Sequence, residues 1–140
     1  MKPVRVYPDS CALIYLVEQH PQWGAAVETL MCPAHGVWPV LIFSELTRLE
    51  CRVKPKKDGN AKLLAAFDQL FATTGYENHD LDRSVFEFAT QLRAQHNLKT
   101  PDALHLAAAI SAGCEEIWTK DDRLLKAAQG RIRNISLGGA

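Results

Sequence analysis

Residues 100–109 read Thr-Pro-Asp-Ala-Leu-His-Leu-Ala-Ala-Ala. Proline suits the first turn of a helix and threonine can cap it, so this stretch predicts a helix from Pro101 to Ala112. Gly113 is the kind of residue that ends a helix. Apolar residues cover nearly the whole circumference of this helix, so we expect it to be buried, with Asp102 in its first turn.

Short β-prone runs lie before and after this helix and alternate with helical segments. The candidate strands are VRVY (4–7), GVWPVLIF (36–43), a weak one near Tyr76–Leu81, EEIWT (115–119) and RIRNISL (131–137). Strands that alternate with helices predict an α/β fold, with a mainly parallel sheet of four to five strands covered on both faces. We expect residues 1–140 to form a single domain. Residues 52–60, RVKPKKDGN, are the most loop-like segment.

Composition narrows the class of protein. The formal net charge is zero, with 47% hydrophobic residues and 23% charged residues, which is ordinary for a soluble protein. A zero net charge argues against strong steering of the whole molecule to nucleic acid, although a local basic patch is compatible with it. The four cysteines form no CxxC pair and are expected to be reduced thiols. With no apolar stretch long enough to span a bilayer, we expect a cytoplasmic protein that does not contact a membrane.

Four acidic residues follow apolar runs or open helices: Asp9, Glu50, Asp102 and Asp121. Ligands of open parallel sheets bind beyond the carboxyl ends of the strands, where Asp9 and Asp121 are expected. Carboxylates gathered there repel one another unless a cation neutralises them, and hard oxygen ligands suit Mg²⁺ or Mn²⁺. For each acid taken alone, a helix-cap or first-turn role is the more common explanation of its position. Taken together, they predict a divalent metal site.

The chain resembles the PIN-domain family, and within it the VapC-like toxin ribonucleases of type II toxin–antitoxin systems. The motifs that carry the resemblance are DSCALIYLVE (9–18), SELTRLE (44–50), LKTPDALHLAAA (98–109) and WTKDDRLL (118–125). The resemblance implies a three-layer α/β/α PIN-like domain and a metal-dependent endoribonuclease that hydrolyses RNA phosphodiester bonds. It also implies a small antitoxin protein as partner, and a homodimer is the expected assembly.

Matched to the family motifs, Asp9 is the first acid, Asp102 the third and Asp121 the fourth, and these three are the expected metal ligands. The middle acid requires a choice of register. Family members often read Ser-x-x-Thr-x-x-Glu, which Ser44, Thr47 and Glu50 fit and Glu45 does not. Glu50 is therefore the expected fourth catalytic residue, as a ligand or as a base-orienting acid.

Other acidic and basic side chains could assist. Asp122 is an expected solvated helix-start residue with an open auxiliary role. The candidates for contacts with RNA phosphates are Arg48, Arg52, Lys54 and Lys120, and a solvated basic loop is the alternative reading for the first three. His105 shares a helix face with Asp102, and we expect it to be packed rather than to bind metal. Trp23, Trp38 and Trp118 are expected in the core.

Three other functions remain open on the residues alone. A haloacid-type phosphatase or a receiver domain would use Asp9 as a phosphoryl acceptor, but Cys11 stands where the phosphatase needs a second aspartate. A non-catalytic PIN-like RNA-binding or interaction module would tolerate loss of an acid, whereas all four are present. A housekeeping PIN nuclease would share the site but not the antitoxin.

Overall fold

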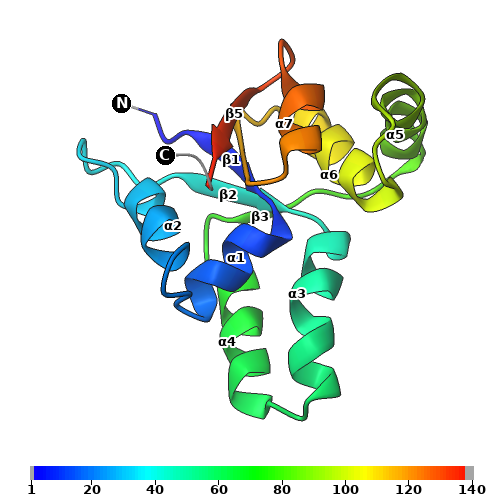
Figure 1. Ribbon diagram of the computed structural model, residues 1–140. Coiled ribbons are helices and arrows are strands. Elements are labelled where there is room, and N and C mark those ends of the chain that lie inside the picture. Colours follow the sequence, from blue (N-terminus) through cyan, green and yellow to red (C-terminus); the bar gives the residue numbers. More distant parts are fainter. Residues whose placement is uncertain (1, 138–140) are drawn as a thin grey trace.

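A five-stranded parallel sheet forms the centre of the computed structural model, which describes residues 2–137 (Figure 1). The strand order is β3-β2-β1-β4-β5, and every paired strand is parallel. The strands are β1 (Arg5–Pro8), β2 (Val40–Phe43), β3 (Glu77–Asn78), β4 (Glu116–Thr119) and β5 (Arg133–Ser136). The helices are α1 (Ser10–Val17), α2 (Gly24–Met31), α3 (Glu45–Lys57), α4 (Ala61–Phe71), α5 (Arg83–His96), α6 (Thr100–Ser111) and α7 (Asp122–Ala128).

Side chains alternate between the two faces of the sheet and build a core on each. Tyr7 of β1 belongs to a buried cluster with residues of α5, α6 and α7. Its neighbour Val6 belongs to a second cluster with residues of α1, α2, α3 and α4. Successive residues of a strand point to opposite faces, so one strand contributes to both cores. The expected three-layer α/β/α architecture is confirmed.

The helix predicted from residues 100–109 lies where the sequence placed it. Residues 103–109 are all buried, as a helix that is apolar all round requires. Gly113 follows the helix, and its φ is +72°. A left-handed φ of this kind favours glycine, which explains why the helix ends at this point.

Two expectations about the core and its loops were wrong. Residues 52–57 continue α3 instead of forming a loop, because Thr47, Cys51 and Pro55 are buried at helical spacing and hold the helix through its last turn. Packing of this stripe outweighs the low helix propensity of an interior proline. Trp38 precedes β2 and is 59% exposed, so it is not a core residue. Trp118 is buried, as expected, and Trp23 is partly buried.

The topology brings the ends of the central strands to one edge of the sheet. Parallel strands share a direction, so the residues that follow β1, β2 and β4 meet at the carboxyl edge. The α3–α4 hairpin projects away from the sheet beside this edge (Figure 1). No helix within residues 2–137 is long and apolar enough to cross a membrane.

Candidate active site

Asp9 and Asp121 are tied together through one buried threonine at the carboxyl edge. The backbone of Asp9 bonds to the Trp118 carbonyl at 2.8 Å, which fixes the residue beside the end of β4. The Thr119 hydroxyl donates to Asp9 Oδ2 at 2.8 Å and accepts the backbone N–H of Asp121 at 3.1 Å. Thr119 is fully buried, and it is the threonine of the Thr-x-Asp pattern by which Asp121 was matched to the family.

Asp121 also caps a helix. Its Oδ1 accepts the backbone N–H groups of Arg123 at 2.9 Å and Leu124 at 3.3 Å, at the start of α7. The helix-cap role considered for this acid is therefore real. The cap uses Oδ1, and Oδ2 accepts no hydrogen bond from residues 2–137.

Asp102 has no such partner among residues 2–137. It lies half-buried in the first turn of α6, and its carboxylate accepts no hydrogen bond from the described part of the chain. Burial raises the pKa of Asp102 above its ordinary value, and the negative charges of Asp121, Asp9 and Glu50 raise it further. The structure thus brings the four predicted acids into one electrostatic cluster, with Asp102 at its least compensated position.

Glu50 enters the cluster from α3. Its Oε1 accepts hydrogen bonds from Ser10 Oγ and His105 Nε2, each at 2.6 Å. Burial alone would raise the pKa of Glu50, but the hydrogen bonds from His105 and Ser10 outweigh it and hold the pKa below its ordinary value. Glu45 is exposed and pairs with Arg48 at 3.0 Å, so it lies outside the cluster.

His105 is buried, as expected, but it is not merely packed. Its Nδ1 lies 2.6 Å from the Tyr7 hydroxyl, and the opposite ring nitrogen contacts Glu50. Tyr7 was missed by the sequence analysis, because a tyrosine in a central strand is common in a core. The sequence held one sign that His105 lies near the site, which is the three-residue spacing that puts it on the same helix face as Asp102.

The chemical type of the ligand atoms at this site suits a hard cation. Asp9, Asp102 and Asp121 offer carboxylate oxygens, which Mg²⁺ and Mn²⁺ prefer. Within residues 2–137, however, no three His, Cys, Asp or Glu side chains already stand in a metal-holding arrangement. Asp122, the neighbour of Asp121, is exposed.

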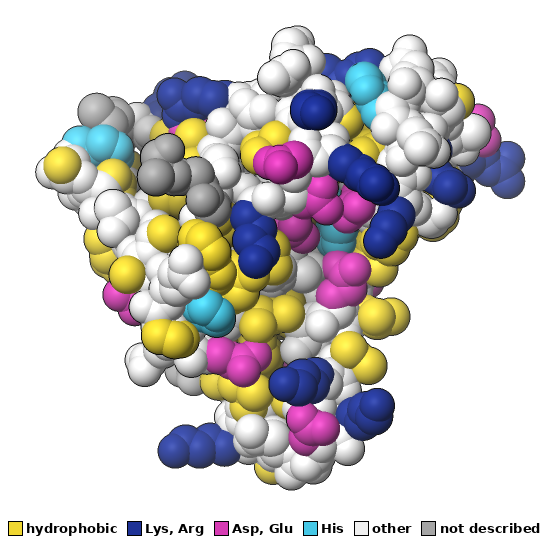
Figure 2. Space-filling view, viewed as in Figure 1, with side chains coloured by type: hydrophobic (Ala, Val, Ile, Leu, Met, Phe, Trp, Pro, Cys, Tyr) yellow, Lys and Arg dark blue, Asp and Glu magenta, His cyan; other side chains and the backbone are white. Residues whose placement is uncertain are grey.

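The basic candidates come from two segments: Arg48, Arg52 and Lys54 from α3, and Lys120 from the turn between β4 and α7. Figure 2 shows acidic side chains gathered where α1, α3, α6 and α7 meet, with lysine and arginine side chains around them. Arg48 forms an ion pair with Glu45 within α3, and Arg52 forms one with Asp68 of α4 at 2.7 Å, whereas Lys54 is exposed. Lys120 lies over the rings of Tyr15 and Trp23, with its Nζ 5.3 and 5.2 Å from their centroids.

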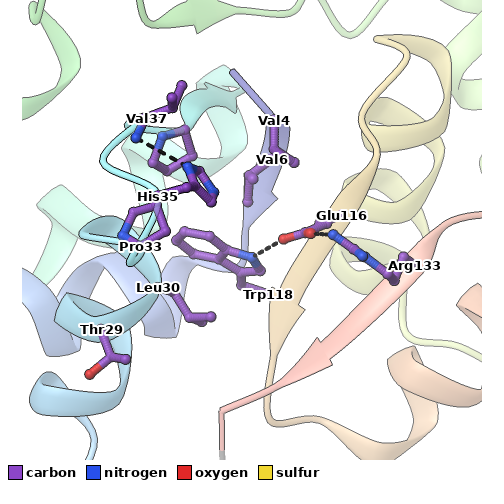
Figure 3. Close-up of a pocket in the computed structure, with 11 residues that line it drawn as sticks. Val4, Val6, Thr29, Leu30, Pro33, His35, Val37, Glu116, Trp118 and Arg133 are labelled. Atoms are coloured by element: carbon purple, nitrogen blue, oxygen red, sulfur yellow. Dashed lines mark hydrogen bonds and ion pairs between the residues drawn. The ribbon is translucent and has the colours of Figure 1, made fainter. Parts of the chain in front are cut away.

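A separate cavity of about 190 Å³ lies at the opposite, amino edge of the sheet (Figure 3). Glu116 is the carboxylate that lines it, and none of the four clustered acids does. Figure 3 shows this carboxylate between the Trp118 indole, whose Nε1 donates to it at 3.0 Å, and Arg133, with which it forms an ion pair. Its charge is thus already compensated, in contrast to that of Asp102 at the carboxyl edge.

Solved structures of similar fold cover nearly the whole chain. A toxin–antitoxin complex from Klebsiella pneumoniae matches with a TM-score of 0.68 and 22% identity, over 96% of this chain and 99% of the other. VapC20 of Mycobacterium tuberculosis, a sarcin–ricin loop cleaving toxin, matches with a TM-score of 0.72 and 14% identity, over 91% and 98%. VapBC2 from Rickettsia felis, bound to a DNA fragment from its promoter, matches with a TM-score of 0.71 and 13% identity, over 95% and 98%.

At these identities the structural matches show a shared fold. A comparison with curated protein sequences gives no match. The family comparison is more specific, because the PIN-domain model matches residues 6–130, a span that contains all four clustered acids. The chain therefore belongs to the PIN-domain family.

Proposed function

We propose that this protein is a metal-dependent endoribonuclease and the toxin of a toxin–antitoxin pair. Membership of the PIN family and the acid cluster at the carboxyl edge support the nuclease activity. The similarity in fold to toxins, one of them a sarcin–ricin loop cleaving toxin, supports RNA as the substrate. The cytoplasm, where its RNA substrate is found, is the proposed location.

The condition of Asp102 carries the proposal. A half-buried carboxylate with no hydrogen-bond donor in the described part of the chain, next to three other acids, is an unfavourable arrangement for a protein that has only to fold. A bound cation would remove this cost, because it replaces repulsion between carboxylates with attraction to a shared charge. The same arrangement is common at functional sites, where ionisable groups are held in strained environments.

Asp9, Asp102 and Asp121 are the proposed ligands of Mg²⁺ or Mn²⁺. Mg²⁺ keeps several waters and usually binds through one or two carboxylates together with substrate phosphates. A complete protein cage is therefore not required before RNA binds. When bound, the ion supplies positive charge to the attacked phosphate and lowers the pKa of a water molecule.

The protein's own side chains would then orient the reaction. Thr119 holds Asp9 in place through Oδ2, and the cap on α7 holds Asp121 through Oδ1. Glu50, kept ionised by its hydrogen bonds, is the proposed group that orients the attacking water and accepts its proton. Lys120, Lys54, Arg48 and Arg52 are the proposed contacts for RNA phosphates, and the two arginines would exchange their present carboxylate partners for phosphate.

The proposed partners are a small antitoxin and a second copy of the chain. Leu49 and Val53 of α3 are 60% and 56% exposed, beside Arg48 and Arg52. They line one groove together with Glu45 and Lys56. Exposed apolar side chains within a charged rim are typical of interaction surfaces. The fold neighbours that are toxin–antitoxin complexes support an antitoxin as the occupant.

The nuclease is tested by cleavage of a labelled single-stranded RNA with Mg²⁺, with Mn²⁺ and with excess chelator. We expect cleavage that disappears with chelator, returns with either ion, and is lost in Asp9→Asn. Asp58→Asn, which removes an exposed acid at the end of α3, is the matched control and should cleave normally. Full cleavage in chelator would contradict the metal mechanism.

The toxin role is tested by expression in a bacterial host. We expect the wild-type chain to arrest growth and Asp9→Asn to relieve the arrest at equal protein level. Growth that is unaffected by a high level of active wild-type protein would favour a housekeeping nuclease.

A further inference from the structure

A chain of short hydrogen bonds runs from the core to Glu50. The Tyr7 hydroxyl lies 3.0 Å from Ser44 Oγ, 3.2 Å from Thr47 Oγ1 and 2.6 Å from His105 Nδ1. His105 Nε2 then lies 2.6 Å from Glu50 Oε1. Apart from Glu50, whose side chain is 30% exposed, every member is buried.

The chemistry of the end groups sets the direction of these hydrogen bonds. An ionised carboxylate only accepts, so His105 Nε2 must carry a proton and donate it to Glu50. We assign Nδ1 of His105 as the acceptor and the Tyr7 hydroxyl as its donor. The Thr47 oxygen accepts the backbone N–H of Ser44 at 3.2 Å, which leaves its hydroxyl proton free to point towards Tyr7. Every donor in the chain thus points towards Glu50.

The second oxygen of Glu50 is treated differently. Ser10 and His105 both donate to Oε1, whereas Oε2 accepts no hydrogen bond from the described residues. One oxygen is held twice by the protein and the other keeps its full accepting capacity. Ser10 directly follows Asp9, and His105 lies one helical turn after Asp102 on α6, so the two donors hold Glu50 beside the acid cluster.

A hydrophobic core of this size does not need a series of buried hydrogen bonds for its stability. A phenylalanine and a leucine would fill much the same volume without polar groups that must all be satisfied. The series of hydrogen bonds ends on the carboxylate of Glu50, at the edge of the proposed site, rather than on another core group. This location favours a role in setting the orientation of Glu50 over a role in stability alone.

We propose that Tyr7, His105 and Ser10 are positioning residues that hold Glu50 in the single orientation needed for RNA cleavage. This inference rests on the proposed nuclease function. A glutamate has three rotatable side-chain bonds, and without the two donors to Oε1 it would sample several rotamers. Loss of partners that orient a site residue typically lowers activity about 10–100-fold.

Two substitutions of His105 separate orientation from packing. Glutamine can place its amide N–H near the position of the imidazole Nε2, so His105→Gln retains a donor for Glu50. Asparagine is shorter and places its amide near Nδ1, so His105→Asn retains a partner for Tyr7 but not for Glu50. We expect His105→Asn to lower kcat about 10–100-fold with KM for RNA changed by less than about twofold, and His105→Gln to restore much of kcat.

Thermal unfolding of both variants and Tyr7→Phe provide the controls. Tyr7→Phe removes the hydroxyl and keeps the ring, so we expect a smaller loss of kcat, of about two- to tenfold, again with KM unchanged. Nitrogen chemical shifts of His105 in the wild-type protein should show the tautomer protonated at Nε2. The tautomer protonated at Nδ1 would overturn the donor-to-acceptor direction that we assign to the hydrogen bonds between Tyr7, His105 and Glu50.

The outcomes distinguish this inference from the function on which it rests. Wild-type protein that cleaves no RNA under any metal condition overturns the proposed nuclease and, with it, positioning for cleavage. Wild-type protein that cleaves, with His105→Asn and His105→Gln equally active, overturns only the positioning role. Equal losses in both variants that follow their melting temperatures would show that His105 serves stability.

Discussion

At the amino edge of the sheet, Glu116 is buried and fully engaged, with the Trp118 indole on one oxygen and Arg133 on the other. At the carboxyl edge, Asp102 is half-buried and has no hydrogen-bond donor among the described residues. A buried charge that the protein itself compensates serves the fold. A charge that the described residues leave uncompensated, with three more acids around it, is one that a bound cation would stabilise. The difference between the two edges supports the proposal that the functional site lies at the carboxyl edge.

The largest expected effect is on Asp102 itself. Asp102→Asn removes one charge from the cluster and keeps the shape of the side chain, so we expect cleavage to fall about 100- to 1,000-fold. The free energy of unfolding at neutral pH should rise, because the ionised carboxylate is disfavoured at this position. Single-turnover RNA cleavage and thermal unfolding measure the two effects. An active variant, or one that is less stable than wild type, would break the comparison.

The second prediction compares two acids on the same helix. Glu50→Gln keeps an oxygen that can accept from Ser10 and His105 but removes the charge, so we expect turnover to fall about 100-fold or more. Glu45→Gln removes only an exposed pair with Arg48 and should cleave within about twofold of wild type. The same cleavage assay measures both variants. The reverse result would show that Glu45 occupies the site.

At the amino edge we expect the opposite pattern from that at Asp102. Glu116→Ala leaves the buried Trp118 N–H without its acceptor, which should lower the free energy of unfolding by about 1–3 kcal/mol. Cleavage per folded molecule should not change, because Glu116 lines the remote cavity and not the acid cluster. Glu116→Gln, which can still accept from Trp118, is the matched control and should cost less. Chemical denaturation and the cleavage assay together decide the outcome.

The order of elements and the positions of the four acids were predictable, because periodicity marks strands and helices and parallel strands end at one edge. The helix from Thr100 was predictable to within about one residue at its start, since proline and threonine mark helix starts in the sequence itself. The extent of α3 was not, because Pro55 signals a break locally while its burial depends on the helices that pack around it.

The hydrogen-bond and ion-pair partners of the acidic side chains could also not be predicted from the sequence. Thr119 and Tyr7 contact Asp9 and His105 across more than 90 positions, and no local pattern specifies such pairs. Arg133 and Glu116 meet only because β4 and β5 are adjacent in register. Motifs therefore located the carboxylates, whereas tertiary structure determined which of them are compensated.

The smallest expected effect is a dependence of stability on pH that the two edges do not share. The pKa of Asp102 is raised in the folded state, so its contribution to stability is fully present below the unfolded pKa and is lost as the pH rises through the folded pKa. Asparagine does not titrate, so the stability advantage of Asp102→Asn should be absent at acidic pH and should grow as the pH rises through that window. It should then level off towards neutral pH.

Denaturation midpoints of wild type and variant across a pH series measure this difference, and saturating Mg²⁺ should reduce it, since a bound cation stabilises the ionised carboxylate. A stability difference that is independent of pH would show that Asp102 is already neutral or compensated in the folded protein, and the contrast with Glu116 would then disappear.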